Sequence, residues 1–286
     1  MPPSTFRPIP MLLSAAFAVL CATAGPASGE EFLGSAAAAP DVSITAGEAP
    51  SSAPLVVETF AGGQTFRGTP NAGSGGDFGF YEGFLLSAPV SDTLGGSVIF
   101  HGGSAFAQSN LGGSALTPES RHQVFATVGA SRRVETGINI GVVGDYLYDD
   151  WYVASSASQL RGETGWAFGG GRELGLWGSL GVSEDSSTEF ITLYGMTFPA
   201  RVRTRPIDLY GAFYRASLAE GGEARFFVGL TDSAQAVGRL DLRVPLSDRL
   251  SIDSGFTYLS PERDDRSIGG LTFGDLPAES WCFRAG

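Results

Sequence analysis

The segment 236–258, AVGRLDLRVPLSDRLSIDSGFTY, alternates apolar and polar residues on both sides of a Pro-Leu-Ser-Asp-Arg turn. Successive side chains of a β-strand point to opposite faces, so a period of two indicates strands, and the turn joins them as a hairpin. This hairpin has one apolar face and one polar, partly charged face. The apolar face carries Leu240, Leu242, Val244, Leu250, Ile252, Phe256 and Tyr258.

Similar strand signals recur from residue 78 onward, and no stretch shows a convincing helical period. Short links rich in Ser, Asp and Gly separate most of them. The pattern therefore predicts an all-β protein built as an antiparallel up-and-down meander of about twelve strands. We expect strands near 78–88, 95–107, 121–132, 136–148, 159–169, 173–183, 188–199, 206–217, 223–231, 236–246, 249–259 and 278–284.

The N-terminus has the pattern of a cleaved signal peptide, residues 1–24. A basic residue precedes the apolar run 11–22, which is shorter than the roughly 20 residues of a transmembrane helix. Ala22-Thr23-Ala24 fits a small-x-small cleavage site. The competing interpretation is a lipoprotein acylated at Cys21, but a Leu before that cysteine disfavours it.

Residues 25–77 are rich in Ala, Gly, Ser and Pro and lack sustained periodicity, which predicts a disordered linker. Within it, Leu55 to Phe60 could be one short strand or a docking segment, or a stray apolar patch, because six residues do not decide the period. The β-domain is then expected over 78–286. If the signal peptide is removed, Cys282 is the remaining cysteine, so the fold must hold without an intramolecular disulfide.

A long meander must close on itself or cover its edges. Aromatic residues near strand ends, such as Tyr146, Tyr148, Trp166 and Tyr258, are typical of the girdles of outer-membrane barrels. We therefore predict a closed transmembrane-type β-barrel in the cell outer membrane. The alternative is a soluble exported or surface-attached β-rich binding module, because a sandwich shows the same alternation.

Charged residues of both signs stand inside the strands, where a barrel would point them into its lumen. They could control the passage of small solutes, as charged rings do in pores. They could instead pair across strands and fill the interior, which the mixture of signs favours. The predicted role is structural, or that of a passive small-solute pore, and the candidate lumen residues are Asp145, Arg161, Glu163, Glu189, Asp208, Arg225, Arg239, Asp241, Arg243 and Asp253.

The formal net charge of −12 makes nucleic acid a poor partner on electrostatic grounds. The expected partners are outer-membrane lipid, the barrel-assembly machinery and, for a pore, a small solute.

Motifs for catalysis are missing, so we expect no enzyme and no cofactor. Neither G-x-S-x-G nor a phosphate-binding glycine loop occurs. His101 or His122 could serve as the base of a barrel-embedded hydrolase, but each is explained equally well as an ordinary polar residue of a strand.

A calcium-binding loop is the other chemistry considered. Asp145, Asp149 and Asp150, with Glu163 near, match no known calcium-loop spacing, so a solvated acidic loop is favoured and no metal site is expected.

Five strand-and-turn segments form a recognisable set: Asp145 to Asp150, Gln159 to Glu163, Glu173 to Trp177, Arg239 to Arg249 and Phe256 to Pro261. Together they resemble an uncharacterised planctomycete family of exported outer-membrane-type β-barrel proteins. The resemblance spans roughly 78–281 and implies the barrel fold, with no active-site or ligand residues.

Two questions stay open in the sequence. The turns 88–94 and 244–250 share a Pro-x-Ser-Asp pattern, yet the predicted strand count places them at opposite ends of the barrel. The strand starting near Glu279 is followed by few residues, so a truncated last strand is one expectation.

Overall fold

The computed structural model of the protein describes most of the chain beyond Leu55. The described residues are 55–67, 77–91, 97–110, 120–150, 154–193, 196–260, 267–268, 271–272 and 280–286. The predicted signal peptide and residues 25–54 and 68–76 of the predicted linker lie outside these ranges.

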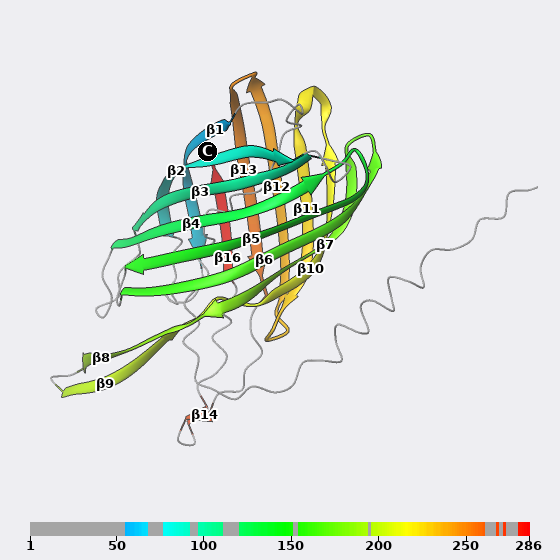
Figure 1. Ribbon diagram of the computed structural model, residues 1–286. Coiled ribbons are helices and arrows are strands. Elements are labelled where there is room, and N and C mark those ends of the chain that lie inside the picture. The colour runs from blue at the N-terminus through cyan, green and yellow to red at the C-terminus, as the bar shows by residue number, and fades with distance from the viewer. Residues whose placement is uncertain are drawn as a thin grey trace, which may run out of the picture. The chain divides into compact units, whose positions relative to one another are not determined.

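Twelve antiparallel strands close into one barrel, which confirms the predicted fold class (Figure 1). Around the wall the order is β1-β16-β13-β12-β11-β10-β7-β6-β5-β4-β3-β2. Their bounds are β1 Val56–Arg67, β2 Asp77–Ser91, β3 Ser97–Asn110, β4 Ser120–Arg133, β5 Thr136–Asp150, β6 Ala154–Gly169, β7 Arg172–Ser183, β10 Leu209–Ser217, β11 Glu223–Thr231, β12 Ala236–Ser247, β13 Leu250–Leu259 and β16 Ser280–Ala285.

The barrel begins earlier than the sequence suggested, because β1 lies inside the stretch assigned to the linker. Val56–Phe66 pairs with β2, and Gly63–Arg67 pairs with β16. β1 contains three consecutive small residues, Ala61-Gly62-Gly63, which weaken its apolar alternation. β1 is therefore identified as a wall strand by its pairing with β2 and β16, and not by the alternation of its own residues.

The predicted strand 188–199 is wrong as a barrel strand. β8 Asp185–Leu193 and β9 Met196–Thr204 form a separate two-stranded sheet inserted between β7 and β10 (Figure 1). Because the segment 188–199 is not a wall strand, the number of strands between the turns 88–94 and 244–250 changes by one, and the two turns no longer fall at opposite ends. The β2–β3 and β12–β13 turns lie at the same end of the barrel, as their shared chemistry suggested.

The two ends of the barrel differ in the length of their connections. At one end, here the short-turn end, neighbouring strands are joined through 92–96, 134–135, 170–171, 218–222 and 248–249. The third of these turns uses Gly170 and Gly171 at φ of 63° and 68°, where a side chain would be strained. The other end, here the long-connection end, carries 68–76, 111–119, 151–153, 184–208, 232–235 and 260–279. These contain the β8–β9 hairpin, the short pair β14 Ser267–Ile268 and β15 Leu271–Thr272, while the single-turn 3₁₀ helix η1 Ala219–Gly221 lies at the short-turn end.

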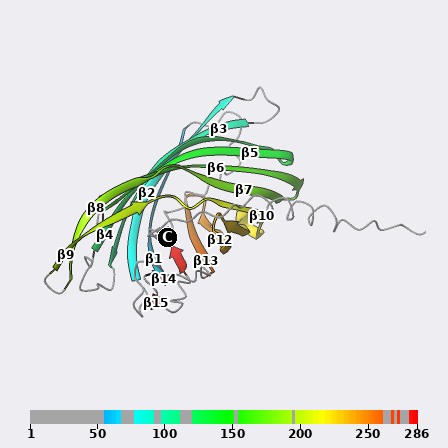
Figure 2. The same cartoon turned by 90° about the horizontal axis from the view of Figure 1, so that it is seen from below.

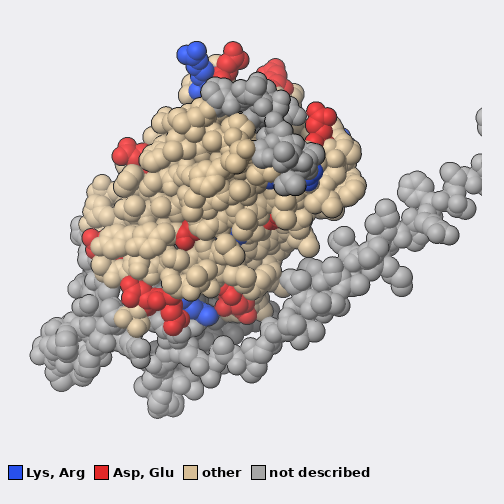
Figure 3. Space-filling view, viewed as in Figure 1, with Lys and Arg blue, Asp and Glu red and all other residues tan. Residues whose placement is uncertain are grey.

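The wall is apolar outside and largely polar inside, the reverse of a soluble protein. The curved wall is seen along its edge in Figure 2, and its outer face is mostly uncharged across the middle in Figure 3. Large apolar side chains stay exposed on every long strand, among them Phe80, Phe106, Val128, Ile140, Val142, Leu160, Leu176, Phe226, Leu240 and Ile252. The buried positions include Gln64, His101, Arg121, Gln123, Asp145, Arg161, Glu173, Ser179 and Arg215.

Two apolar clusters line the inner wall beside the polar residues. One contains Leu85, Ala105 and Phe125; the other contains Phe213, Phe227 and Val237. In the second, the rings lie over glycines of neighbouring strands, and a Cβ at Gly175 or Gly211 would come within 2.6 Å of a ring carbon of Phe213 or Phe227 respectively. Glycine at these points lets the aromatic side chains lie flat against the wall.

Among the described residues, no helix is long and apolar enough to cross a membrane.

Candidate functional site

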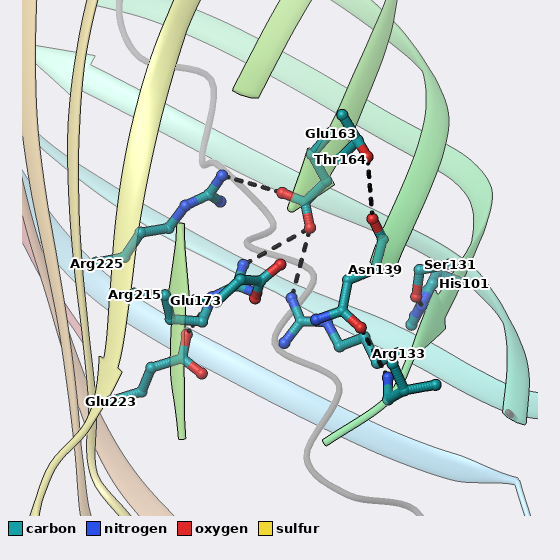
Figure 4. Close-up of polar contacts among 11 residues, drawn as sticks. His101, Ser131, Arg133, Asn139, Glu163, Thr164, Glu173, Arg215, Glu223 and Arg225 are labelled. Atoms are coloured by element: carbon teal, nitrogen blue, oxygen red, sulfur yellow. Dashed lines mark hydrogen bonds and ion pairs between the residues drawn. The ribbon is translucent and has the colours of Figure 1, made fainter. Parts of the chain in front are cut away.

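Six charged side chains meet inside the barrel near the short-turn end, and we call them the short-turn network (Figure 4). Glu163 is the acceptor at its centre, with oxygens 3.0 Å from Arg225, 3.5 Å from Arg133 and 3.6 Å from Arg215. Arg215 in turn lies 2.6 Å from Glu173 and 3.3 Å from Glu223. Three guanidinium groups and three carboxylates therefore share one region.

The strand register brings these side chains together. Arg215 of β10 stands opposite Glu173 of β7 on one side and opposite Arg225 of β11 on the other. Two like charges opposite each other destabilise a sheet, and the carboxylates of Glu163 and Glu173 offset that repulsion. The Arg225 guanidinium also lies 4.3 Å from the centre of the Phe213 ring, a cation–π contact.

A second group, the seam network, lies where β16 closes the barrel. Asp241 accepts hydrogen bonds from Arg239 at 2.8 Å and from Arg284 at 3.4 Å. Arg243 contacts Glu58 of β1 at 2.6 Å and Asp253 of β13 at 3.6 Å. These contacts link β12 to both strands that flank β16. A cavity of about 30 Å³ lies between the two networks, room for about one water molecule.

Farther toward the long-connection end, two more ion pairs lie inside. Arg161 donates to both oxygens of Asp145, with Nη2 2.9 Å from Oδ1, and Gln159 donates to the same carboxylate at 3.0 Å. Arg121 donates its Nε to Asp149 at 2.8 Å. Such two-pronged Arg–carboxylate pairs fix both side chains.

The inward-facing charges differ in exposure: at the seam the side chains of Arg243, Glu58 and Asp253 are 28%, 32% and 49% exposed, whereas other members are shielded from solvent. The exposed fraction is 3% for Arg121 and 5% for both Asp145 and Arg215. A charge lining a wide aqueous channel would be hydrated, so these low values indicate that Arg121, Asp145 and Arg215 are packed among other side chains.

Eight of the ten predicted lumen residues lie on barrel strands and join these inner ion pairs. They are Asp145, Arg161, Glu163, Arg225, Arg239, Asp241, Arg243 and Asp253. Whether any of them binds a solute stays a prediction.

The other two predicted lumen residues do not lie on barrel strands, contrary to the strands predicted over 188–199 and 206–217. Glu189 belongs to β8, which pairs with β9 in a two-stranded sheet separate from the barrel. Asp208 lies in the connection before β10, where its Oδ1 accepts a hydrogen bond from the Gly181 backbone N–H at 2.7 Å. It holds two segments together at the long-connection end. Both residues alternated with apolar neighbours, and a local pattern does not distinguish a barrel strand from an inserted hairpin.

Sequence reasoning missed several members of these networks. Arg133, Glu173 and Glu223 stand at or next to the ends of their strands, and none of them was among the predicted lumen residues. Glu58 was missed together with β1. The sequence did contain a signal for them. Each is separated by an even number of residues from the inward-facing residues of its own strand, so it lies on the same face.

The two histidines lie on opposite faces of the wall. His101 is buried inside, with Nδ1 3.1 Å from Ser87 Oγ and Nε2 2.8 Å from Ser131 Oγ. His122 neighbours Arg121 on β4 and faces outward. The acidic residues considered for calcium, Asp145 and Asp149, pair with different arginines. Within the described part of the chain, no group of three or more His, Cys, Asp or Glu side chains is arranged to hold a metal ion.

The sequence from residue 56 to 281 matches the model of a family described as a family of unknown function, DUF6666. The chain belongs to this family. The matched segment begins at the first residue of β1 and extends into β16, so it corresponds to the barrel.

Among solved structures, the chain is similar to the crystal structure of the beta domain of the Bordetella autotransporter Brka. The TM-score is 0.44 at 13% sequence identity, and the comparison covers 79% of this chain and 97% of that one. No curated protein matches the sequence significantly.

Proposed function

We propose that the protein is an outer-membrane β-barrel with a structural role, its interior braced by paired charges. The observation that carries this proposal is the reversed polarity of the wall. Exposed Val, Leu, Ile and Phe side chains form the outer face of the strands, while Arg, Asp and Glu are buried inside. A lipid environment makes this arrangement favourable, because apolar groups contact the acyl chains and every backbone polar group pairs within the closed sheet.

The dimensions of the apolar surface support the same proposal. On β5 the outward row runs from Ile138 to Tyr148. That segment is roughly 33 Å long at about 3.3 Å per residue, and a strand tilt of about 40° reduces its height to roughly 25 Å. An apolar band of an outer-membrane barrel has about this height.

The ends of the barrel fit one orientation in the outer membrane. Outward-facing tyrosines near the long-connection end, including Tyr146, Tyr148, Tyr210 and Tyr258, and Trp166 with Phe168 near the short-turn end supply aromatic residues at both boundaries. Outer-membrane barrels have short periplasmic turns and longer extracellular loops. The short-turn end is therefore the periplasmic end in this proposal, and insertion is the task of the barrel-assembly machinery.

Passive passage of a small solute is the second candidate role, and the observation in its favour is the mixed charge of the inner wall. The pairing of those charges favours the structural role. Reconstituted in planar bilayers, the full chain should show little or no conductance in its folded state. Regular single-channel steps would replace the structural role by the pore.

The membrane location has its own test. We expect the exported protein to fractionate with membranes, to need detergent for extraction, and to migrate faster on a denaturing gel when unheated than when boiled. Release by salt or alkali without detergent, with no shift on heating, would instead support the soluble binding module.

A further inference from the structure

A hollow on the outer face near the short-turn end combines a basic side chain with a large aromatic one. Its volume is about 750 Å³, and it lies at the β4–β5 turn beside the start of β5 and the end of β6. The hollow is shallow and widely open on the outer side, so a lipid headgroup can reach its lining. The side chains that matter for its chemistry are Arg132, Glu135, Thr136, Ile138 and Trp166.

The strand register explains why these groups meet. Ile138 of β5 stands directly opposite Trp166 of β6, and both side chains are more than half exposed on the outer wall. Arg132 stands opposite Ile140, which lies two residues farther from the turn than Ile138. Its Nη1 donates a hydrogen bond to the Ile138 carbonyl at 3.2 Å, so the guanidinium extends toward the short-turn end. A long basic side chain that leaves an apolar band in this way reaches the polar boundary of a membrane.

We propose that this hollow binds the headgroup of an anionic glycerophospholipid, with Arg132 contacting the phosphate. The proposal rests on the membrane location argued above. Guanidinium groups recognise phosphate oxygens through paired N–H donors, and an indole at the interface packs along the glycerol region with its N–H toward polar groups.

The local charge favours an anionic headgroup over a zwitterionic one. Among the described residues that border the hollow, Arg132 and Arg133 accompany one acid, Glu135. Arg133 also lies 3.5 Å from Glu163 inside the barrel, so Arg132 is the arginine placed on the outer face. A choline headgroup would bring its own cation close to this guanidinium, whereas a glycerol headgroup would not.

The test uses the full chain, purified in detergent and confirmed to be heat-modifiable. Mixed micelles supply phosphatidylglycerol or phosphatidylcholine, and native mass spectrometry counts the lipids that stay bound. We expect the wild type to retain phosphatidylglycerol about fivefold better, as one interfacial arginine would provide. Arg132→Gln should lose this preference. Arg249→Gln, an exposed arginine of the β12–β13 turn at the same end, should keep it.

Equal retention of the two lipids by the wild type, or an equal loss in both variants, overturns the proposal. If Arg132→Gln does not fold, a phosphatidylglycerol with a photoactivatable headgroup is applied to the wild type instead. Labelling of the segment 132–138 is the expected result, and labelling spread evenly around the barrel contradicts it. A wild-type protein without heat modifiability would mean that the membrane location is wrong, which is a separate outcome from a folded barrel without lipid preference.

Discussion

At the scale of single residues, glycine and arginine positions decide how the inside of the barrel is filled. Gly175 faces the ring of Phe213 across the β7–β10 pair, and ring atoms lie 2.6 Å from where a Cβ would stand. Gly238 on β12 has no atom within 4 Å of the same position. The two glycines therefore separate the effect of crowding from the effect of losing a glycine.

We predict that Gly175→Val lowers the free energy of unfolding by about 1–3 kcal/mol, because the added methyl groups displace the Phe213 ring in a packed wall. Gly238→Val should change it little or raise it, since a branched side chain suits an outward strand position. Denaturant titration in detergent micelles measures both. A similar loss in the two variants would mean that crowding against Phe213 is not the cause.

Arg215 is the residue on which the short-turn network depends. Its guanidinium lies beside three carboxylates, so Arg215→Met should leave Glu163, Glu173 and Glu223 close together without their shared cation. The expected loss of unfolding free energy is about 3–5 kcal/mol, and a second substitution, Glu173→Met, should restore part of it.

The control for Arg215 is a pair at the surface. Arg205 and Asp232 are 3.0 Å apart with side chains 32% and 28% exposed. Arg205→Met should therefore cost only about 0–1 kcal/mol by the same titration. Equal costs for the two substitutions would show that the inner network adds no more than an exposed ion pair.

At the scale of elements, the β8–β9 hairpin is separate from the barrel wall. Asp185 and Thr204 are paired residues at its base, so a two-residue turn can join them directly. We predict that replacing 186–203 by Asn-Gly leaves a closed, heat-modifiable barrel, because the wall keeps all its strand pairs. Removing β10 and β11 by the same approach should abolish heat modifiability. Loss of the gel shift in the hairpin deletion would show that the barrel depends on the hairpin.

At the scale of the whole molecule, the stability cost of an arginine placed on the outer face shows whether that face contacts lipid or water. Val142 lies at the middle of β5 and faces outward, while Leu246 faces outward close to the β12–β13 turn. In an outer-membrane barrel, Val142→Arg should cost about 2–4 kcal/mol and Leu246→Arg about 0–1 kcal/mol. Refolding into lipid vesicles, followed by denaturant titration, measures this difference. A water-soluble module would tolerate both substitutions equally.

The strong alternation in 236–258 was enough to predict both strands of one hairpin and the direction of each side chain. Leu240 is exposed on the outer wall, while Arg239 and Asp241 pair inside. The same reasoning failed for β1, whose central small residues hide the period, and for β8, whose local pattern resembles that of a wall strand. In both cases the deciding information is the identity of the partner strands, which lie far away in the chain.

Local alternation and turn chemistry, present in the sequence alone, determined that the chain is all-β and that each long strand has one apolar face. The tertiary structure decided that the strands close as twelve, and which charges meet across the interior. Glu58 and Arg243 are 185 positions apart, yet they contact each other because β1 and β12 flank the strands that close the barrel. Closure and register are properties of the whole sheet, so no single strand carries them.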